Sequence, residues 1–417
     1  MARRLLLLAL LALSAGAATA PAHSQRPGDA PRRPRLAVDA DSNDARAYIA
    51  LAEAQLEARP REAADAFYWA YQLEPSSASA LYGRYAALLT SNPQRLVDYW
   101  NGERRVVRSR EVLAIDSLYF RALTMNPFLH RVHENQLFRV YMHTVARQGF
   151  DRAGGVSSVT EGDVIGWIHS FMQHRAPAWL RAEEAYASGR NPDALRYYGE
   201  AIEDARRGRS WLRADRARLH AHMGNNAGAM TDFTQAIQDM RTEDERNLVY
   251  LYQSKALLEH SIGSLHERMG NRDAAREAYG RALTEDLAFY PAHVRMGMLA
   301  LAAGDTTTAL GELDLAAQAG EPHVVYTYGA VLAQLGRLDE AAQQLERVMG
   351  MTPHWAEPYF VMGAVRDGQA DLGKARAAYE GFLARAPRGH RRRATAEARV
   401  ADLQGAGQDA AQPAGGR

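Results

Sequence analysis

Residues 262–279 are IGSLHERMGNRDAAREAY, and the order of small and large residues in this stretch decides the fold. A glycine stands at position 263, an alanine twelve residues later at 275, and a tyrosine four residues after that at 279. Helix-forming residues with apolar side chains three or four apart predict two helices joined at Gly270. Gly263 and Ala275 let the two helices approach closely, and Tyr279 fills the groove between them.

Three later segments repeat this pattern at steps of 34, 32 and 34 residues. The repeated alanines are Ala275, Ala309, Ala341 and Ala375, and the glycines twelve residues before them are Gly263, Gly297, Gly329 and Gly363. Glycine makes up 33 of the 417 residues. Four glycines in one phase would arise by chance at roughly one in 25,000, before the choice of phase is allowed for, so the repeat is real.

The pattern resembles the tetratricopeptide repeat, in which small residues mark the crossing of two antiparallel helices. Weaker copies lie upstream around Ala194 and Ala229, with Ala182 and Ala217 at the crossing instead of glycine. We therefore expect about six repeats over 176–388. The resemblance implies an all-α fold: a right-handed α-solenoid of antiparallel helix pairs, each buried only by stacking on its neighbours.

The rest of the chain divides around this array. Residues 41–90 contain one or two degenerate repeats, and residues 91–175 do not fit the repeat. Apolar spacing predicts a helical insertion there, with helices at about 92–100, 109–123, 130–147 and 161–174. Residues 25–40 form a Pro- and Arg-rich linker, and residues 389–417 a C-terminal helix and disordered tail.

The first 24 residues have the form of a secretory signal. Arg3 and Arg4 precede an apolar run from Leu5 to Leu13, and small residues follow. This run is too short for a membrane-spanning helix, which needs about 20 residues. We expect cleavage after Ser24 and a periplasmic or extracellular protein with no transmembrane span in its mature chain.

The composition excludes several classes of protein. Hydrophobic residues make up 47% of the chain, which is too many for a mostly disordered protein, and the net charge of +1 argues against a nucleic-acid binder. The chain has no cysteine, so disulfides, thiol catalysis and cysteine-bound metals are excluded. Neither HExxH, GxSxG nor GxxxxGK[ST] occurs. We expect no enzymatic activity and no cofactor.

The resemblance implies that a protein or peptide partner binds the concave face, which the first helix of each repeat lines. These positions are aromatic and mixed in charge, and lack the asparagine and lysine with which chaperone-binding members hold a carboxylate terminus. Such a groove suits a partner with apolar anchors. The candidate partner-binding residues are Trp179, Glu183, Tyr186, Trp211, His260, Glu267, Tyr326 and Phe360. The sequence favours a non-catalytic scaffold or adaptor, placed in a cell-envelope complex or outside the cell.

Other interpretations stay open. The insertion can hold the site of an enzyme or a regulatory module, with His130 and His133 as metal ligands. Arginine-rich faces can bind an anionic polymer or lipid; the clusters are Arg104-Arg105, Arg206-Arg207-Arg209 and Arg391-Arg392-Arg393. Some groove aromatics, Trp179 and Trp211 especially, can instead pack against the insertion.

Overall fold

The computed structural model describes residues 30–100, 110–152, 159–205, 208–244 and 254–411, and within these ranges it contains twenty α-helices and no strand. The helices before the array are α2 (Ala45–Gln55), α3 (Pro60–Leu73), α4 (Ala78–Thr90), α5 (Pro93–Trp100), α6 (Arg110–Met125), α7 (Glu134–Arg152) and α8 (Glu161–His174). The expected signal, residues 1–24, lies outside the described residues.

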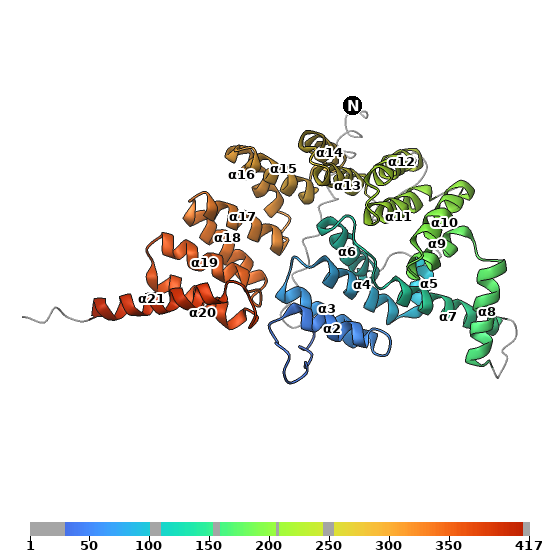
Figure 1. Cartoon of the computed structure of the whole chain (residues 1–417), viewed down its shortest axis with the longest axis horizontal. Helices are drawn as coiled ribbons and strands as arrows, with labels where there is room; N and C mark the ends of the chain where they lie inside the picture. Colours follow the sequence, from blue (N-terminus) through green and yellow to red (C-terminus); the bar gives the residue numbers. More distant parts are fainter. Residues whose placement is uncertain (1–29, 101–109, 153–158, 206–207, 245–253, 412–417) are drawn as a thin grey trace, which may run out of the picture.

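The next twelve helices form six antiparallel pairs, in which the first helix is called helix A and the second helix B. The pairs are α9 (Ala178–Ala187) with α10 (Asn191–Asp204), α11 (Arg209–His222) with α12 (Asn226–Asp244), α13 (Lys255–Arg268) with α14 (Arg272–Glu285), α15 (Tyr290–Ala302) with α16 (Thr306–Ala317), α17 (Pro322–Gln334) with α18 (Leu338–Met351), and α19 (Glu357–Gly368) with α20 (Leu372–Arg385). They follow one another in an arc across the top of Figure 1. The fold is an α-solenoid.

The crossing glycines allow the two helices of a pair to approach closely. A Cβ at Gly263 would lie 2.5 Å from the ring of the buried Tyr279, and one at Gly363 would meet a tyrosine ring at 2.6 Å. At Gly329 the nearest atoms, including a carbon of Leu345, are 3.3 Å away. At Gly297 a Cβ would lie 2.9 Å from a carbon of Leu313. Glycine is therefore needed more at positions 263, 297 and 363 than at 329.

A second column of glycines makes the turn between the helices of a pair. Gly270, Gly304 and Gly336 have φ values of 80°, 82° and 77°, in the left-handed region that glycine enters without strain. The sixth pair has Ala370 at this place, and among the described residues it is the only non-glycine residue with positive φ, at 58°. The same backbone turn is kept there at a steric cost.

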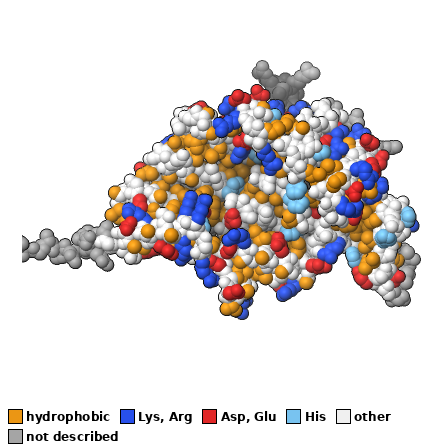
Figure 2. Space-filling view, in the orientation of Figure 1, with side chains coloured by type: hydrophobic (Ala, Val, Ile, Leu, Met, Phe, Trp, Pro, Cys, Tyr) orange, Lys and Arg blue, Asp and Glu red, His pale blue; other side chains and the backbone are white. Residues whose placement is uncertain are grey.

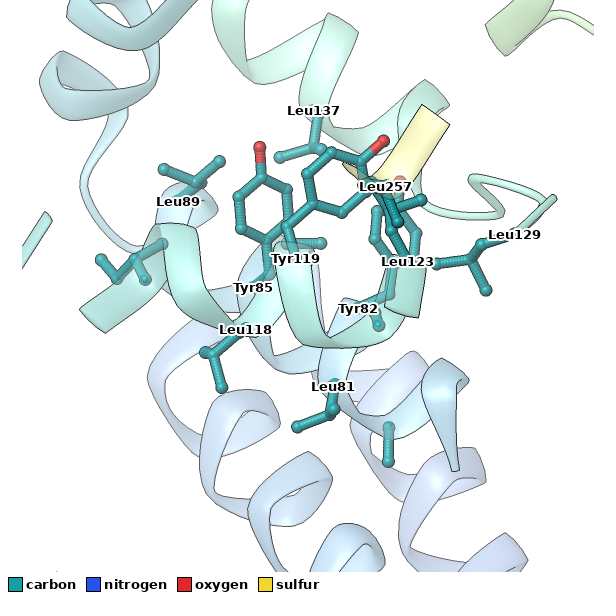
Figure 3. Packing of buried hydrophobic residues seen from close by; sticks show 14 of the residues in the cluster. Leu81, Tyr82, Tyr85, Leu89, Leu118, Tyr119, Leu123, Leu129, Leu137 and Leu257 are labelled. Carbon is teal, nitrogen blue, oxygen red and sulfur yellow. The ribbon is translucent and has the colours of Figure 1, made fainter. Parts of the chain in front are cut away.

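The N-terminal helices and the insertion share one hydrophobic core with the array. Helix α2 packs on α3, and α4 packs on α3 and α6. Figure 3 shows Tyr82 and Tyr85 of α4 beside Tyr119 of α6, and the rings of Tyr85 and Tyr119 stack at 4.9 Å. Leu257 of α13 is fully buried in the same cluster. The insertion is therefore joined to the repeats by packing as well as by the chain.

The insertion helices lie close to the ranges that the sequence predicts, with one difference. Helix α7 begins at Glu134, whereas apolar spacing predicted a start near residue 130. Residues 126–133, between α6 and α7, are not helical. This segment is instead held by a contact with the array, in which the amide of Arg131 donates to the hydroxyl of Tyr186 at 2.9 Å.

The two ends of the described chain meet. The side-chain amide of Asn43 donates to the carbonyl of Ala384 at 3.0 Å, and the amide of Arg388 donates to the carboxylate of Asp41 at 2.6 Å. Figure 1 shows α2 and α3 near α20. The last helix, α21 (Arg393–Ala411), packs on α20 and continues past the glycines at 405 and 407. These contacts join the end of the last repeat to the segment that precedes α2.

In the described parts of the chain, no helix combines the length and the apolar character that crossing a membrane requires.

Candidate partner-binding site

The inner side of the repeat arc is occupied by the insertion. In Figure 1, α6 lies inside the arc formed by the helix pairs. Its three main contacts with α15 and α17 are the ring of Phe120 against Phe289 at 6.5 Å, the hydroxyls of Thr124 and Tyr290 at 2.9 Å, and the guanidinium of Arg121 against the carboxylate of Glu321 at 2.7 Å. The space-filling view shows the molecule hollowed between the upper and lower helices, with hydrophobic side chains on part of the wall (Figure 2). The groove is therefore covered by α6 as far as the start of α17.

Phe128, in the connection between α6 and α7, fills a hollow in the array. It is 6% exposed and belongs to a cluster whose other buried members all come from α11 to α14. Its ring lies 6.4 Å from Phe233, and the guanidinium carbon of Arg268 lies 3.9 Å from its centroid. The small residues Ala214 and Ala221 of α11 belong to the same cluster and leave room for this ring.

Arg131, three residues later, is held by the first repeat. Its guanidinium lies 3.2 Å from the carboxylate of Glu183 and 3.3 Å from that of Glu134, and donates to the hydroxyl of Tyr198 at 3.0 Å. Tyr198 in turn donates to Glu183 at 2.6 Å. The guanidinium also lies over the ring of Tyr186, 4.6 Å from its centroid. The network satisfies a buried charge with several partners, which is the condition for burying it at all.

Among the residues that the structure describes, the carboxyl groups of Glu134 and Glu183 both pair with the guanidinium of Arg131. Burial raises the pKa of Glu134 above its usual range, Arg131 opposes the shift, and the nearby carboxylate of Glu183 adds to it. The hydroxyl of Tyr82 donates to Glu134 at 3.3 Å. Glu134 therefore keeps its proton over a wider range of pH than an exposed glutamate does.

The structure spreads the eight predicted partner-binding residues over five repeats. Glu183, Tyr186 and His260 are 4%, 8% and 3% exposed. His260 lies between the rings of Tyr279 and Phe289, at 5.3 Å and 5.7 Å, and burial lowers its pKa to about 3. A partner reaches these three side chains only after the insertion or the neighbouring repeats move.

Three further predicted residues are half-buried and hold parts of the chain together. Trp179 packs against the cluster that contains the insertion, and its ring meets that of Trp211 edge to face at 6.4 Å. Glu267 accepts hydrogen bonds from Tyr279 of its own pair and, at 2.8 Å, from the Nε of Arg295 on the next helix A. These contacts within the chain account for the two tryptophans and the glutamate at these positions without a bound partner protein.

Tyr326 of α17 and Phe360 of α19 are also half-buried, but their ring contacts come from the repeats and from the connection after α20. The ring of Tyr326 lies 4.6 Å from that of Trp355. The guanidinium of Arg392 lies 4.8 Å from the ring of Phe360 and makes an ion pair with Glu357 at 2.9 Å. Tyr326 and Phe360 are thus the two predicted partner-binding residues at the C-terminal end of the groove, past the residues that α6 contacts.

Sequence reasoning missed Phe128 and Arg131, which connect the insertion to the groove. The signal that was available is Ala214, because it stands at a groove position where each of the other repeats carries a larger side chain. The residue that fills such a hollow comes from a distant segment, so the pattern of the array alone does not name it.

The two histidines proposed as metal ligands have different surroundings. His130 stacks on His222 with ring centroids 4.3 Å apart and bonds the hydroxyl of Tyr186 at 3.0 Å. His133 is buried against Phe67 and Tyr82, which lowers its pKa to about 4. Among the described residues, no group of three His, Asp or Glu side chains is arranged to hold a metal ion.

The arginine clusters are described only in part. Residues 104–105 and 206–207 lie outside the described residues. In the third cluster, Arg392 pairs with Glu357 and Arg393 pairs with Glu397 at 3.0 Å, while Arg391 is exposed. Much of the charge of this cluster is thus balanced within the protein.

Comparison with known families identifies one of these helix pairs. A tetratricopeptide repeat model matches residues 260–288, which contain most of α13 and all of α14. The chain therefore contains a tetratricopeptide repeat, the class of module that acts in protein–protein interaction. No curated protein matches the chain in sequence.

Several solved structures are similar in arrangement. YrrB, described as a tetratricopeptide protein with an unusual peptide-binding site, is 18% identical, with a TM-score of 0.35, over 45% of this chain and 90% of its own. A tetratricopeptide repeat protein from Parabacteroides merdae is 12% identical, with a TM-score of 0.37, over 65% and 99%. The APC/C hetero-tetramer Cut9–Hcn1 is 16% identical, with a TM-score of 0.39, over 86% and 76%. At such low similarity no partner or activity passes from them to this chain.

Proposed function

We propose that this protein is a non-catalytic scaffold that binds a protein or peptide partner. The observation that carries the proposal is the stack of six helix pairs, which gives an extended curved surface. Repeat arrays of this kind bind partners across many shallow contacts, whereas a catalytic site needs a few groups held in a rigid pocket.

The partner surface that we propose is the end of the groove formed by α17 and α19. Tyr326 and Phe360 lie there on successive A helices and are partly exposed. Aromatic side chains that are already ordered by their neighbours lose little entropy on binding and are common binding anchors. The exposed Arg391 adds a positive charge beside them. This surface suits a segment with apolar anchors and an acidic residue.

We also propose that the protein works outside the cytoplasm, in a periplasm or beyond the cell. The support is the sequence of residues 1–24, with its two arginines, its short apolar run and its small residues before Gln25. Membership of a cell-envelope assembly is part of this proposal.

The experiment is affinity capture with the mature chain, residues 25–417, as bait in an extract of the cell envelope. A second bait carries Tyr326→Ala and Phe360→Ala, and a matched control bait carries Leu315→Ala, which removes a side chain that is 49% exposed on helix B of another repeat. We expect a partner that the wild-type and control baits retain and the double variant loses. Equal capture by all three baits contradicts the proposed surface, and no specific capture contradicts the scaffold function.

A further inference from the structure

We propose that residues 126–133 are a tethered ligand of the groove, and that the groove over α9 to α13 recognises peptides with an aromatic residue three positions before an arginine. This inference rests on the proposed function, because it assumes that the groove binds peptides. It adds the chemistry of the ligand and the reason why this part of the groove is closed in the structure.

The segment lies in the groove as a bound peptide does. It is not helical, and it runs in the direction opposite to the order of the repeats, with Phe128 at α11 to α13 and Arg131 at α9 and α10. The amide of Arg131 donates to the hydroxyl of Tyr186, so a groove side chain holds the backbone of the segment itself. A contact of this kind holds the backbone of a peptide whatever its side chains are.

The two anchors are read by different chemistry. Phe128 is buried in the apolar cluster formed by α11 to α14, with its ring 6.4 Å from that of Phe233, and the guanidinium of Arg268 lies over its ring. Arg131 meets the carboxylate of Glu183 at 3.2 Å. An apolar hollow and a buried acid, one on each side, select an aromatic side chain and a guanidinium.

Two other positions of the segment are not enclosed as the two anchors are. Val132 is 55% exposed. His130 is exposed too, although its ring stacks on His222 at 4.3 Å and bonds the hydroxyl of Tyr186 at 3.0 Å. Leu129 is buried in the large cluster that the N-terminal helices and the insertion share with the array, where any apolar side chain suits the surroundings. The two positions with specific chemistry are therefore Phe128 and Arg131, which give the pattern Phe-x-x-Arg.

Tethering explains why this part of the groove is closed to other peptides. A segment joined to its site by a short connection has an effective concentration on the order of millimolar or more. A free peptide with the same two anchors competes only at comparable concentrations. A substitution that weakens the binding of Phe128 or Arg131 to the groove should therefore allow a free peptide that carries both side chains to bind.

The test uses the mature chain and a synthetic peptide with the sequence of residues 126–133, NPFLHRVH. Binding is measured by calorimetry to the wild type, to Phe128→Leu and to Phe128→Ala, each shown to be folded by circular dichroism. A control peptide has alanine in place of its phenylalanine and arginine. The conservative Phe128→Leu keeps an apolar side chain in the hollow, so the series gives an answer even if Phe128→Ala does not fold.

We expect the peptide to bind Phe128→Leu more tightly than the wild type and Phe128→Ala more tightly still, by at least about tenfold over the wild type. The control peptide should not bind. Equal affinity of the peptide for all folded chains, or equal binding of both peptides, overturns the inference. The affinity capture that tests Tyr326 and Phe360 does not depend on this peptide. A negative peptide result would therefore overturn the inference about residues 126–133 and would not decide the proposed function.

Discussion

Arg131 and Glu183 are 52 residues apart in the sequence, and their charged groups lie 3.2 Å apart in the structure. The side chains are only 12% and 6% exposed, so this ion pair is inside the protein. It joins the insertion to the first repeat of the array. The pair holds residues 126–133 in the groove at its α9 end.

Arg131→Ala should strongly destabilise the protein, because it leaves the buried carboxylate of Glu183 without its cation and the buried carboxyl group of Glu134 without its hydrogen-bond partner. Breaking a buried pair in this way costs about 3–5 kcal/mol. The matched control is Arg139→Ala, whose ion pair with Glu57 is exposed at 50% and 69%. An exposed pair contributes about 0–1 kcal/mol. Denaturant unfolding of both variants measures the difference, and similar losses would show that the Arg131 network is not buried.

Glu134 should make stability depend on pH. Its pKa in the folded protein is raised from the usual 4.5, chiefly by burial, so the folded state binds its proton more tightly than the unfolded state does. The stability therefore falls as the pH rises from about 4.5 through the raised pKa. Glu134→Gln keeps the shape without the charge and should flatten this part of the curve. Thermal unfolding from about pH 5 to about pH 9 tests it, and parallel curves for the two proteins would refute the role of Glu134.

The crossing glycines should differ in how they tolerate alanine. At Gly263 the added methyl would meet the ring of Tyr279 at 2.5 Å, and overpacking of this kind costs about 1–3 kcal/mol. At Gly329 the nearest atoms lie at 3.3 Å, and the gain in helix propensity of up to about 1 kcal/mol offsets the contact. We expect Gly263→Ala to lower the unfolding midpoint clearly and Gly329→Ala to leave it nearly unchanged. The reverse order would contradict this account of the crossings.

The mature protein should begin at Gln25. Ala22, His23 and Ser24 give small residues around a peptidase site, whereas Pro21 would obstruct cleavage after Ala20. Expression in a bacterium, cell fractionation and N-terminal sequencing measure both the compartment and the cleavage point. A chain that keeps Arg3 and Arg4 and stays in the cytoplasmic fraction would disprove export.

Much of the fold follows from local rules that the sequence shows directly. The distance of twelve residues between Gly263 and Ala275 follows from two helices crossing at one point, and it recurs in each repeat. The turn glycines, such as Gly270, mark where one helix ends. These features depend on residues close in the chain, so periodicity and spacing reveal them.

The filling of the groove depends on residues far apart in the chain, and a single sequence gives almost no sign of it. Nothing in the neighbourhood of Arg131 indicates that its partner is Glu183, or that residues 130–133 leave the helix predicted for them. The groove positions of the array were predicted from the repeat, but their occupant was not. Trp179 packs against the large cluster that the insertion shares with the array, and also against the core of its own repeat.

The central claim is that the connection between α6 and α7 lies in the concave face of the repeats. The rings of His130 in that connection and His222 at the end of α11 are stacked 4.3 Å apart, and both residues are exposed. Because the chain has no cysteine, His130→Cys and His222→Cys together introduce its only two thiols. A control chain pairs His130→Cys with Leu372→Cys, an exposed position on α20.

The measurement is the yield of the intramolecular cross-link under mild oxidation or with a short bifunctional thiol reagent, followed by peptide mapping. We predict rapid and nearly complete linking of the 130–222 pair in the folded protein, and little in the control chain or after denaturation. Equal, slow linking in both chains would place the connection outside the groove and contradict the account.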